Sequence, residues 1–187
     1  MKSHRILAIL SILLFPALAC SIFVGGPDYP EGRIPISAEA VTSLKQQFEE
    51  AVVAGAQSGT VTLEMTEEQL TSFIAYKTVA QQSPLFTDPQ VYLREGQMRI
   101  YGRVQRGYFI ANVLIVLNVN VNESGKPSIE ITSADFGPFP VPEGLKQSLA
   151  VILTEAYTGS LGPVATGFRL ETIAIADGIM TLTGRMK

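Results

Sequence analysis

Ile-Ala-Asn-Val-Leu-Ile-Val-Leu-Asn-Val-Asn-Val-Asn, residues 110–122, is the stretch that decides the fold. Aliphatic side chains occupy every second position from Val113 to Val121, while the positions between them change from Leu114 and Val116 to asparagines. Such a period of two, with one face apolar throughout, is typical of a strand that lies on a core. The sequence therefore predicts one long strand here with a buried face.

Shorter strands are predicted on both sides of it. Residues 60–65 and 128–135 show the same alternation. Four more strands form two hairpins, each closed by an acidic residue and a glycine: 91–94 with 97–104 around Glu95-Gly96, and 168–176 with 179–186 around Asp177-Gly178.

The two hairpins also match each other without gaps. Glu95–Val104 reads EGQMRIYGRV, and Asp177–Met186 reads DGIMTLTGRM. A helix is predicted before each, which indicates a helix-plus-hairpin pseudo-repeat. Turn chemistry common to any two hairpins explains the acid-glycine pairs equally well, but explains the matched Gly-Arg less easily.

Amphipathic helices are predicted between the strands. The first covers residues 38–54, with Ser37 as its N-cap and Gly55 and Gly59 as stop signals.

A capping box of Thr66 and Gln69 opens a second helix that ends before Pro84. A third helix is marked by apolar residues at helical spacing: Leu145, Leu149, Ile152, Leu153 and Ala156. Helices and antiparallel hairpins in this order predict the α+β class.

The N-terminus has the parts of a secretory signal peptide: a basic start, an apolar run over 6–14, and Ala17-Leu18-Ala19 before Cys20. These last four residues resemble a bacterial lipobox, whose cysteine is acylated and becomes the first residue of the mature protein. Two alternatives stay open. Ala17-Leu18-Ala19 also fits ordinary cleavage, and the lack of charge from Ile6 to Gly26 would suit an uncleaved anchor helix.

These features divide the chain into three parts. Residues 1–19 are a lipoprotein signal peptide, residues 20–35 are a lipidated cysteine with a Gly/Pro tether, and residues 36–187 are a single domain. The expected location is extracytoplasmic, with acyl chains on Cys20 holding the protein on the bacterial cell membrane.

Composition favours a protein without catalytic chemistry. The 187 residues include one Cys, one His and no Trp, and removal of residues 1–19 takes away the histidine and leaves 12 basic and 17 acidic side chains. A histidine-free domain lacks the usual general base, a single cysteine gives no disulfide framework or cysteine-based metal site, and the acidic balance opposes nucleic-acid binding. No cofactor is expected.

Asp135 is interpreted as an Asx-turn residue at the Gly-Pro corner that follows it.

Arginines and tyrosines alternate in the region of the first hairpin. Two interpretations stay open: contact with lipid headgroups, or a solvated face of the sheet. The residues are Arg94, Arg99, Arg103 and Arg106 with Tyr92, Tyr101 and Tyr108.

Three segments carry a resemblance to a known family: TEEQL at 66–70, GPFPVP at 137–142 and IAIADGIMTLTG at 173–184. With the order of elements, they resemble small bacterial extracytoplasmic proteins of the tubular lipid-binding (TULIP-like) superfamily. The resemblance implies a strongly curved antiparallel sheet packed around amphipathic helices, with an apolar groove for acyl chains and no catalytic residues. The groove positions that it implies are Leu70, Phe73, Ile74, Val113, Ile115, Leu149 and Ile152.

The function expected from the sequence is therefore non-catalytic binding of lipid acyl chains by a membrane-anchored lipoprotein. A structural or assembly lipoprotein with a filled core is the alternative. Such a protein would dock a partner, not identifiable from the sequence, at a sheet edge or at the Pro-rich corner.

Overall fold

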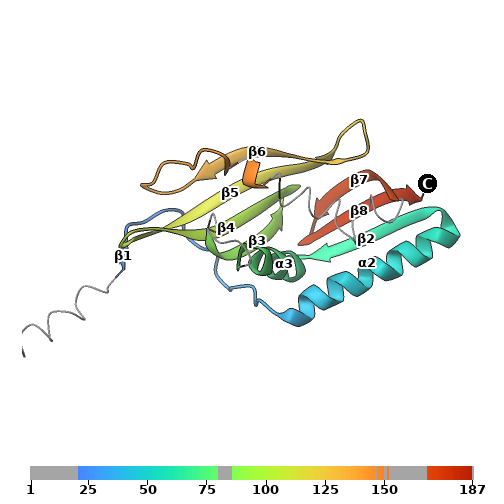
Figure 1. Ribbon diagram of the computed structural model, residues 1–187, viewed down its shortest axis with the longest axis horizontal. Coiled ribbons are helices and arrows are strands. Elements are labelled where there is room, and N and C mark those ends of the chain that lie inside the picture. Colours follow the sequence, from blue (N-terminus) through green and yellow to red (C-terminus); the bar gives the residue numbers. More distant parts are fainter. Residues whose placement is uncertain (1–20, 80–85, 146, 150, 152–167, 187) are drawn as a thin grey trace, which may run out of the picture.

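The computed structural model describes residues 21–79, 86–145, 147–149, 151 and 168–186 of the chain. This part is a mixed α+β fold that consists mostly of strands, as predicted (Figure 1). Its elements are β1 (Ile22–Phe23), α2 (Ala38–Ser58), β2 (Thr60–Thr66), α3 (Glu67–Val79), β3 (Thr87–Arg94), β4 (Gln97–Arg106), β5 (Phe109–Val121), β6 (Pro127–Asp135), β7 (Phe168–Ala176) and β8 (Ile179–Met186).

The strands form two sheets. In the five-stranded sheet β5 pairs with β4 along one edge, while β6 and β1 share its other edge, and β3 lies beyond β4. In the other sheet the order is β2-β8-β7. The strands curl into a half-barrel, with α2 lying along β2 (Figure 1).

The long strand predicted over residues 110–122 is β5, and its apolar face is buried as predicted. Val113, Ile115, Leu117 and Val119 are all buried in the main apolar core. Because β5 has partners on both edges and one face on this core, it is the centre of the larger sheet.

Both predicted hairpins are present. Glu95 and Gly96 have φ of 55° and 75°, and Asp177 and Gly178 have φ of 52° and 78°. Positive φ at two successive turn residues is the requirement of a type I′ turn, which glycine satisfies without strain. The first hairpin begins earlier than predicted, at Thr87, because a bulge between Thr87 and Gln90 accommodates Pro89 within the strand.

The helix termini confirm the predicted caps, with one correction. The backbone N–H of Ala40 donates to Ser37 Oγ at the start of α2. The helix continues past Gly55, which was predicted to stop it, and ends at Gly59, where φ is 77°. Gly55 is instead a contact residue: an ideal Cβ there would lie 2.2 Å from Cγ2 of Val61, so its lack of a side chain lets α2 approach β2.

Residues 21–37, here called the N-terminal segment, lie against the domain. Ile22 N–H donates to Tyr108 O, Val24 N–H donates to Ile110 O, and Asn112 N–H donates to Gly25 O. The segment therefore continues the sheet edge of β5 where β6 no longer covers it. The Gly/Pro composition that predicted a tether belongs to a segment with extensive contacts.

A close crossing explains the glycines of this segment. An ideal Cβ on Gly26 would lie 2.2 Å from the backbone oxygen of Asn112, and one on Gly137 would lie 2.9 Å from Cα of Gly26. Both glycines also have positive φ, of 110° and 59°. Only residues without a side chain fit where the N-terminal segment passes between β5 and the corner after β6.

We predict that Gly26→Ala destabilises the protein more than Gly32→Ala does. Both positions have positive φ, so both variants carry backbone strain of about 1 kcal/mol. Only position 26 adds a collision with backbone, since nothing lies within 4 Å of an ideal Cβ on Gly32. We expect an additional cost of about 1–3 kcal/mol for Gly26→Ala, measured by urea unfolding. Equal costs would contradict the close crossing.

Candidate functional site

The free edge of β3 is covered by side chains of α3. Leu93 N–H donates to Glu67 Oε1 at 2.7 Å, and Val91 N–H donates to Thr71 Oγ1 at 2.9 Å. The acceptors are four residues apart on the helix and the donors two apart on the strand, which matches one helical turn to two strand residues. Helix side chains thus satisfy buried N–H groups that a further strand would otherwise satisfy.

The next step of this series has no hydrogen bond to make. The strand residue there is Pro89, which has no N–H, and the helix residue one turn beyond Thr71 is Ala75, which has no acceptor. Both line a pocket of about 290 Å³ between the end of α3 and the start of β3. The polar series therefore ends where an apolar pocket begins.

The lining of this pocket is apolar with a polar rim. Its apolar members among the described residues are Ile36, Ala75, Tyr76, Val79, Phe86 and Pro89. Phe86 also belongs to the main core, whereas Val79 is 85% exposed. The pocket therefore connects the surface with the edge of the core.

Alternate residues of β3 hold the N-terminal segment in place. The buried Gln90 side chain accepts from Ile34 N–H at 2.7 Å and donates to Ile34 O at 3.2 Å, as a paired strand would. Tyr92 Oη donates to Gly32 O, and Tyr29 Oη donates to Asp88 O. Gln90 and Tyr92 share one face of the strand because strand side chains alternate, and Asp88 lies in the bulge that precedes them.

Tyr29 lies in a group of charges and aromatic rings. The guanidinium carbons of Arg33 and Arg103 each lie 5.5 Å from its ring centroid. The same two arginines flank the Asp88 carboxylate, with N–O distances of 2.9 and 3.7 Å. Burial raises the pKa of the Tyr29 hydroxyl well above its usual value, and the charge of Asp88 adds to the rise.

Most of the arginines predicted to face either lipid or solvent have acidic partners. Arg94 pairs with Glu67, Arg99 with Glu95, and Arg103 with Asp88. Arg106 instead lies over the ring of Phe139, with 5.7 Å between its guanidinium carbon and the ring centroid.

A second, polar cleft of about 630 Å³ lies where the two acid-glycine turns converge on the start of α3. Two of its charged residues bind each other: Arg94 donates to both oxygens of Glu67, and one of these also accepts from Leu93 N–H. Within the described part of the chain, no group of three or more metal-ligating side chains is present.

Asp135, interpreted as an Asx-turn residue, accepts from Gly137 N–H at 2.8 Å, which confirms that role.

The predicted groove residues occupy the core. Leu70, Val113, Ile115 and Leu149 are buried in one cluster, and Ile74 packs against it. Phe73 is half-buried, with Lys77 Nζ 5.8 Å from its ring centroid. The lining described for the two pockets includes none of these six, and Ile152 and Cys20 lie outside the described residues.

The residues of the apolar pocket were not found from the sequence. Helical spacing drew attention to large side chains such as Leu70 and Ile74, which do contact the core, but α3 also buries the small residues Thr71, Ser72, Ala75 and Thr78. The sequence does contain one signal, which is that Pro89, without an N–H, lies opposite the small Ala75 of the preceding helix. That signal has meaning only once the two elements are known to lie side by side.

No helix among the described residues is both long and apolar enough to cross a membrane. Comparison of the sequence with protein-family models and with curated proteins finds no match.

Thr71→Val is predicted to lower the free energy of unfolding by about 1–3 kcal/mol, because it removes the acceptor of a buried N–H without changing the side-chain shape. Thr42→Val is the matched control, since Thr42 is exposed and its hydroxyl only donates to Ala38 O. The control should change stability by less than about 0.5 kcal/mol in the same urea titration. A similar loss in both variants would contradict the role of Thr71 at the strand edge.

Stability is predicted to fall as the pH rises above about 10, the usual pKa of tyrosine in an unfolded chain. The folded state retains the Tyr29 proton above that pH, so unfolding releases a proton and becomes more favourable as pH rises. This contribution is fully present below about pH 10 and is lost above it. Tyr29→Phe should show a shallower decrease of unfolding free energy over this range in urea titrations followed by circular dichroism. A decrease as steep as in the wild type would contradict the assignment.

Proposed function

We propose that the protein is a membrane-anchored bacterial lipoprotein that binds an acyl chain between helix and sheet without catalysing a reaction. The observation that carries this proposal is the apolar pocket between α3 and β3. Its volume of about 290 Å³ is at the lower end of the range of small-molecule sites, which suits part of one chain better than a two-chain lipid.

The chemistry of the pocket supports an apolar ligand. Its lining includes the small Ala75, whose backbone lies within α3, and Pro89, which has no N–H that would need a polar partner in the pocket. Each CH₂ group transferred from water into such a site contributes about 0.8 kcal/mol. Thr87 and Asp88 also line the pocket, but the Thr87 hydroxyl donates to Arg103 O and the Asp88 carboxylate is paired with Arg33 and Arg103.

In this proposal, the groove residues implied by the family resemblance contact the inner end of the bound acyl chain. Phe86 belongs both to the pocket and to the core that contains Leu70, Val113, Ile115 and Leu149. In the proposed complex the pocket is the entrance, and the acyl chain extends past Phe86 towards these side chains.

The anchor is part of the same proposal. A basic start, an apolar run and Ala17-Leu18-Ala19-Cys20 support export and acylation of Cys20, with the protein on the outer surface of the bacterial cell membrane. The lack of histidine after residue 19 supports the absence of catalysis.

We propose that the hairpins β3–β4 and β7–β8, each with a helix predicted before it in the sequence, form a pseudo-repeat of the TULIP-like kind. Supporting it, the two turns share the same pair of positive φ angles, and both turns line the polar cleft.

A second candidate function is docking of a protein partner at a sheet edge. It is favoured by β6, which among the described strands pairs only with β5 and leaves its other edge open. An added strand on that edge would be a familiar mode of peptide recognition.

The acyl-chain proposal is tested with cis-parinaric acid, a fluorescent fatty acid, added to the purified full chain. Val79→Asp places a carboxylate on the exposed rim of the pocket and should weaken binding about fivefold or more. Val53→Asp is the control, because Val53 is 63% exposed on α2 and does not line the pocket. It should leave the affinity unchanged.

Two results would contradict the proposal. One is absence of binding by the folded wild-type protein, together with absence of lipid in its organic extract, which would favour the docking function. The other is an equal effect of the two variants, which would place any binding elsewhere.

A further inference from the structure

Exposed apolar side chains cluster at the end of the molecule where β1 meets the turn between β4 and β5. Ile22 is 52% exposed, Phe23 60%, Tyr108 63% and Phe109 47%. We call these four residues the tip. A group of adjacent exposed large apolar side chains marks a surface that contacts something other than water.

Backbone pairing fixes the tip in place. Ile22 and Phe109 are register partners in the parallel pair of β1 and β5, and Ile22 N–H donates to Tyr108 O at 2.6 Å. Register partners lie on the same face of a sheet and successive residues on opposite faces, so Ile22 and Phe109 lie on one face and Phe23 on the other. The tip is therefore apolar on both faces, which suits insertion into an apolar phase rather than packing of one face on a core.

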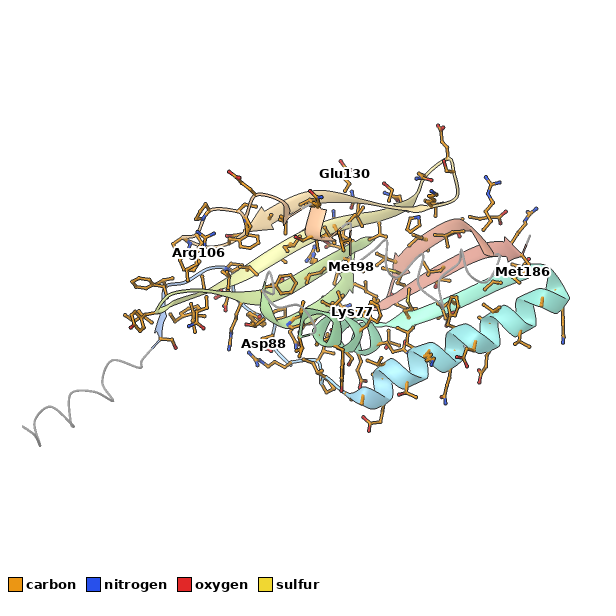
Figure 2. All side chains as sticks on the ribbon, in the orientation of Figure 1. Lys77, Asp88, Met98, Arg106, Glu130 and Met186 are labelled. Carbon is orange, nitrogen blue, oxygen red and sulfur yellow. The ribbon has the colours of Figure 1, made fainter. Side chains whose placement is uncertain are left out.

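The surroundings of the tip are almost uncharged. Residues 21–27, 104–112 and 136–142 contain one charged side chain, Arg106. It is exposed and lies over the Phe139 ring at the same end of the molecule, opposite to the end that carries Met186 (Figure 2). A lone cation beside exposed aromatic rings suits the phosphate layer of a bilayer, with the rings below it.

The direction of the chain indicates what covers the tip. The described structure begins at Ser21, next to Cys20, and an apolar run precedes both in the sequence. No free spacer follows, because the N-terminal segment is hydrogen-bonded to the domain from Ile22 onward. Any bilayer that holds residue 20 therefore lies directly at the tip.

We propose that the tip inserts into the lipid bilayer and fixes the orientation of the domain on it, an inference that rests on the proposed anchoring at Cys20. The pocket then lies near the membrane as well. Thr87 at its rim pairs with Arg103, three residues from Arg106 along β4, which is a distance of about 10 Å. An acyl chain that leaves the bilayer beside the tip thus has a short path to the pocket.

The natural chain contains no tryptophan, so a single introduced one reports its own surroundings. The full chain, produced with its own leader, is reconstituted into vesicles of equal phosphatidylglycerol and phosphatidylethanolamine, with or without bromine on the acyl chains. Tyr108→Trp should give blue-shifted emission that brominated lipid quenches. Val53→Trp, on exposed α2, should show neither effect.

A second substitution tests the tip as a unit. Phe23→Asp, added to Tyr108→Trp, should lower the quenching at least about twofold, because a carboxylate at the neighbouring position opposes insertion. Val53→Asp in the same background should leave the quenching unchanged.

The outcomes separate insertion from anchoring. Flotation of the protein with the vesicles, lost in Cys20→Ala, together with unquenched Tyr108→Trp would overturn the tip proposal and leave the anchor standing. Failure of the unaltered chain to float would overturn both, whereas failure of fatty-acid binding alone would leave the tip unaffected. A blue shift that is present without lipid and grows with protein concentration would mean that a second copy covers the tip, which also overturns the proposal.

Discussion

The unpaired edge of β3 is the constraint on which most of the described structure depends. Val91 and Leu93 are fully buried, so their outward N–H groups cannot reach water and need acceptors within the protein. Thr71 and Glu67 supply these acceptors, which determines both the distance and the register of α3 against the strand. A helix with large apolar side chains on this face could not approach closely enough to form the same bonds.

The same strand also holds the N-terminal segment. The Asp88 carboxylate pairs with Arg33, Tyr92 Oη donates to Gly32 O, and Gln90 forms with Ile34 the two hydrogen bonds that a neighbouring strand would form. Ser72 on α3 contributes as well, since its hydroxyl accepts from Ser37 N–H just before α2. Strand β3 thus contacts the N-terminal segment, α3 and the apolar pocket directly, and it is connected to the start of α2 through Ser72.

The sequence predicted those parts of the fold that follow from local patterns. Alternation in 110–122 identified β5, the acid-glycine pairs identified the hairpin turns, and Thr66 with Gln69 identified the start of α3, where each backbone N–H donates to the other side chain. The rest depends on pairings between distant residues. Gly25 and Gly26 have the composition of a linker, but at Gly26 the glycine serves a close crossing over Asn112. Likewise Thr71 is an unremarkable helix residue until Val91 is placed beside it, so the pocket at Ala75 and Pro89 could not be foreseen.

The parallel pairing of Ile22 with Phe109 has a consequence for how the protein reaches its folded state. During synthesis, Ile22 leaves the ribosome long before β5 has been made. Ile22 and Phe23 therefore have no partner strand until β5 exists, and long-range pairings of this kind form late because of their loop-closure cost. If that end is held by lipid, as proposed, the larger sheet closes onto its own attachment point when β1 joins β5, and this pairing sets the orientation of the sheet at the membrane.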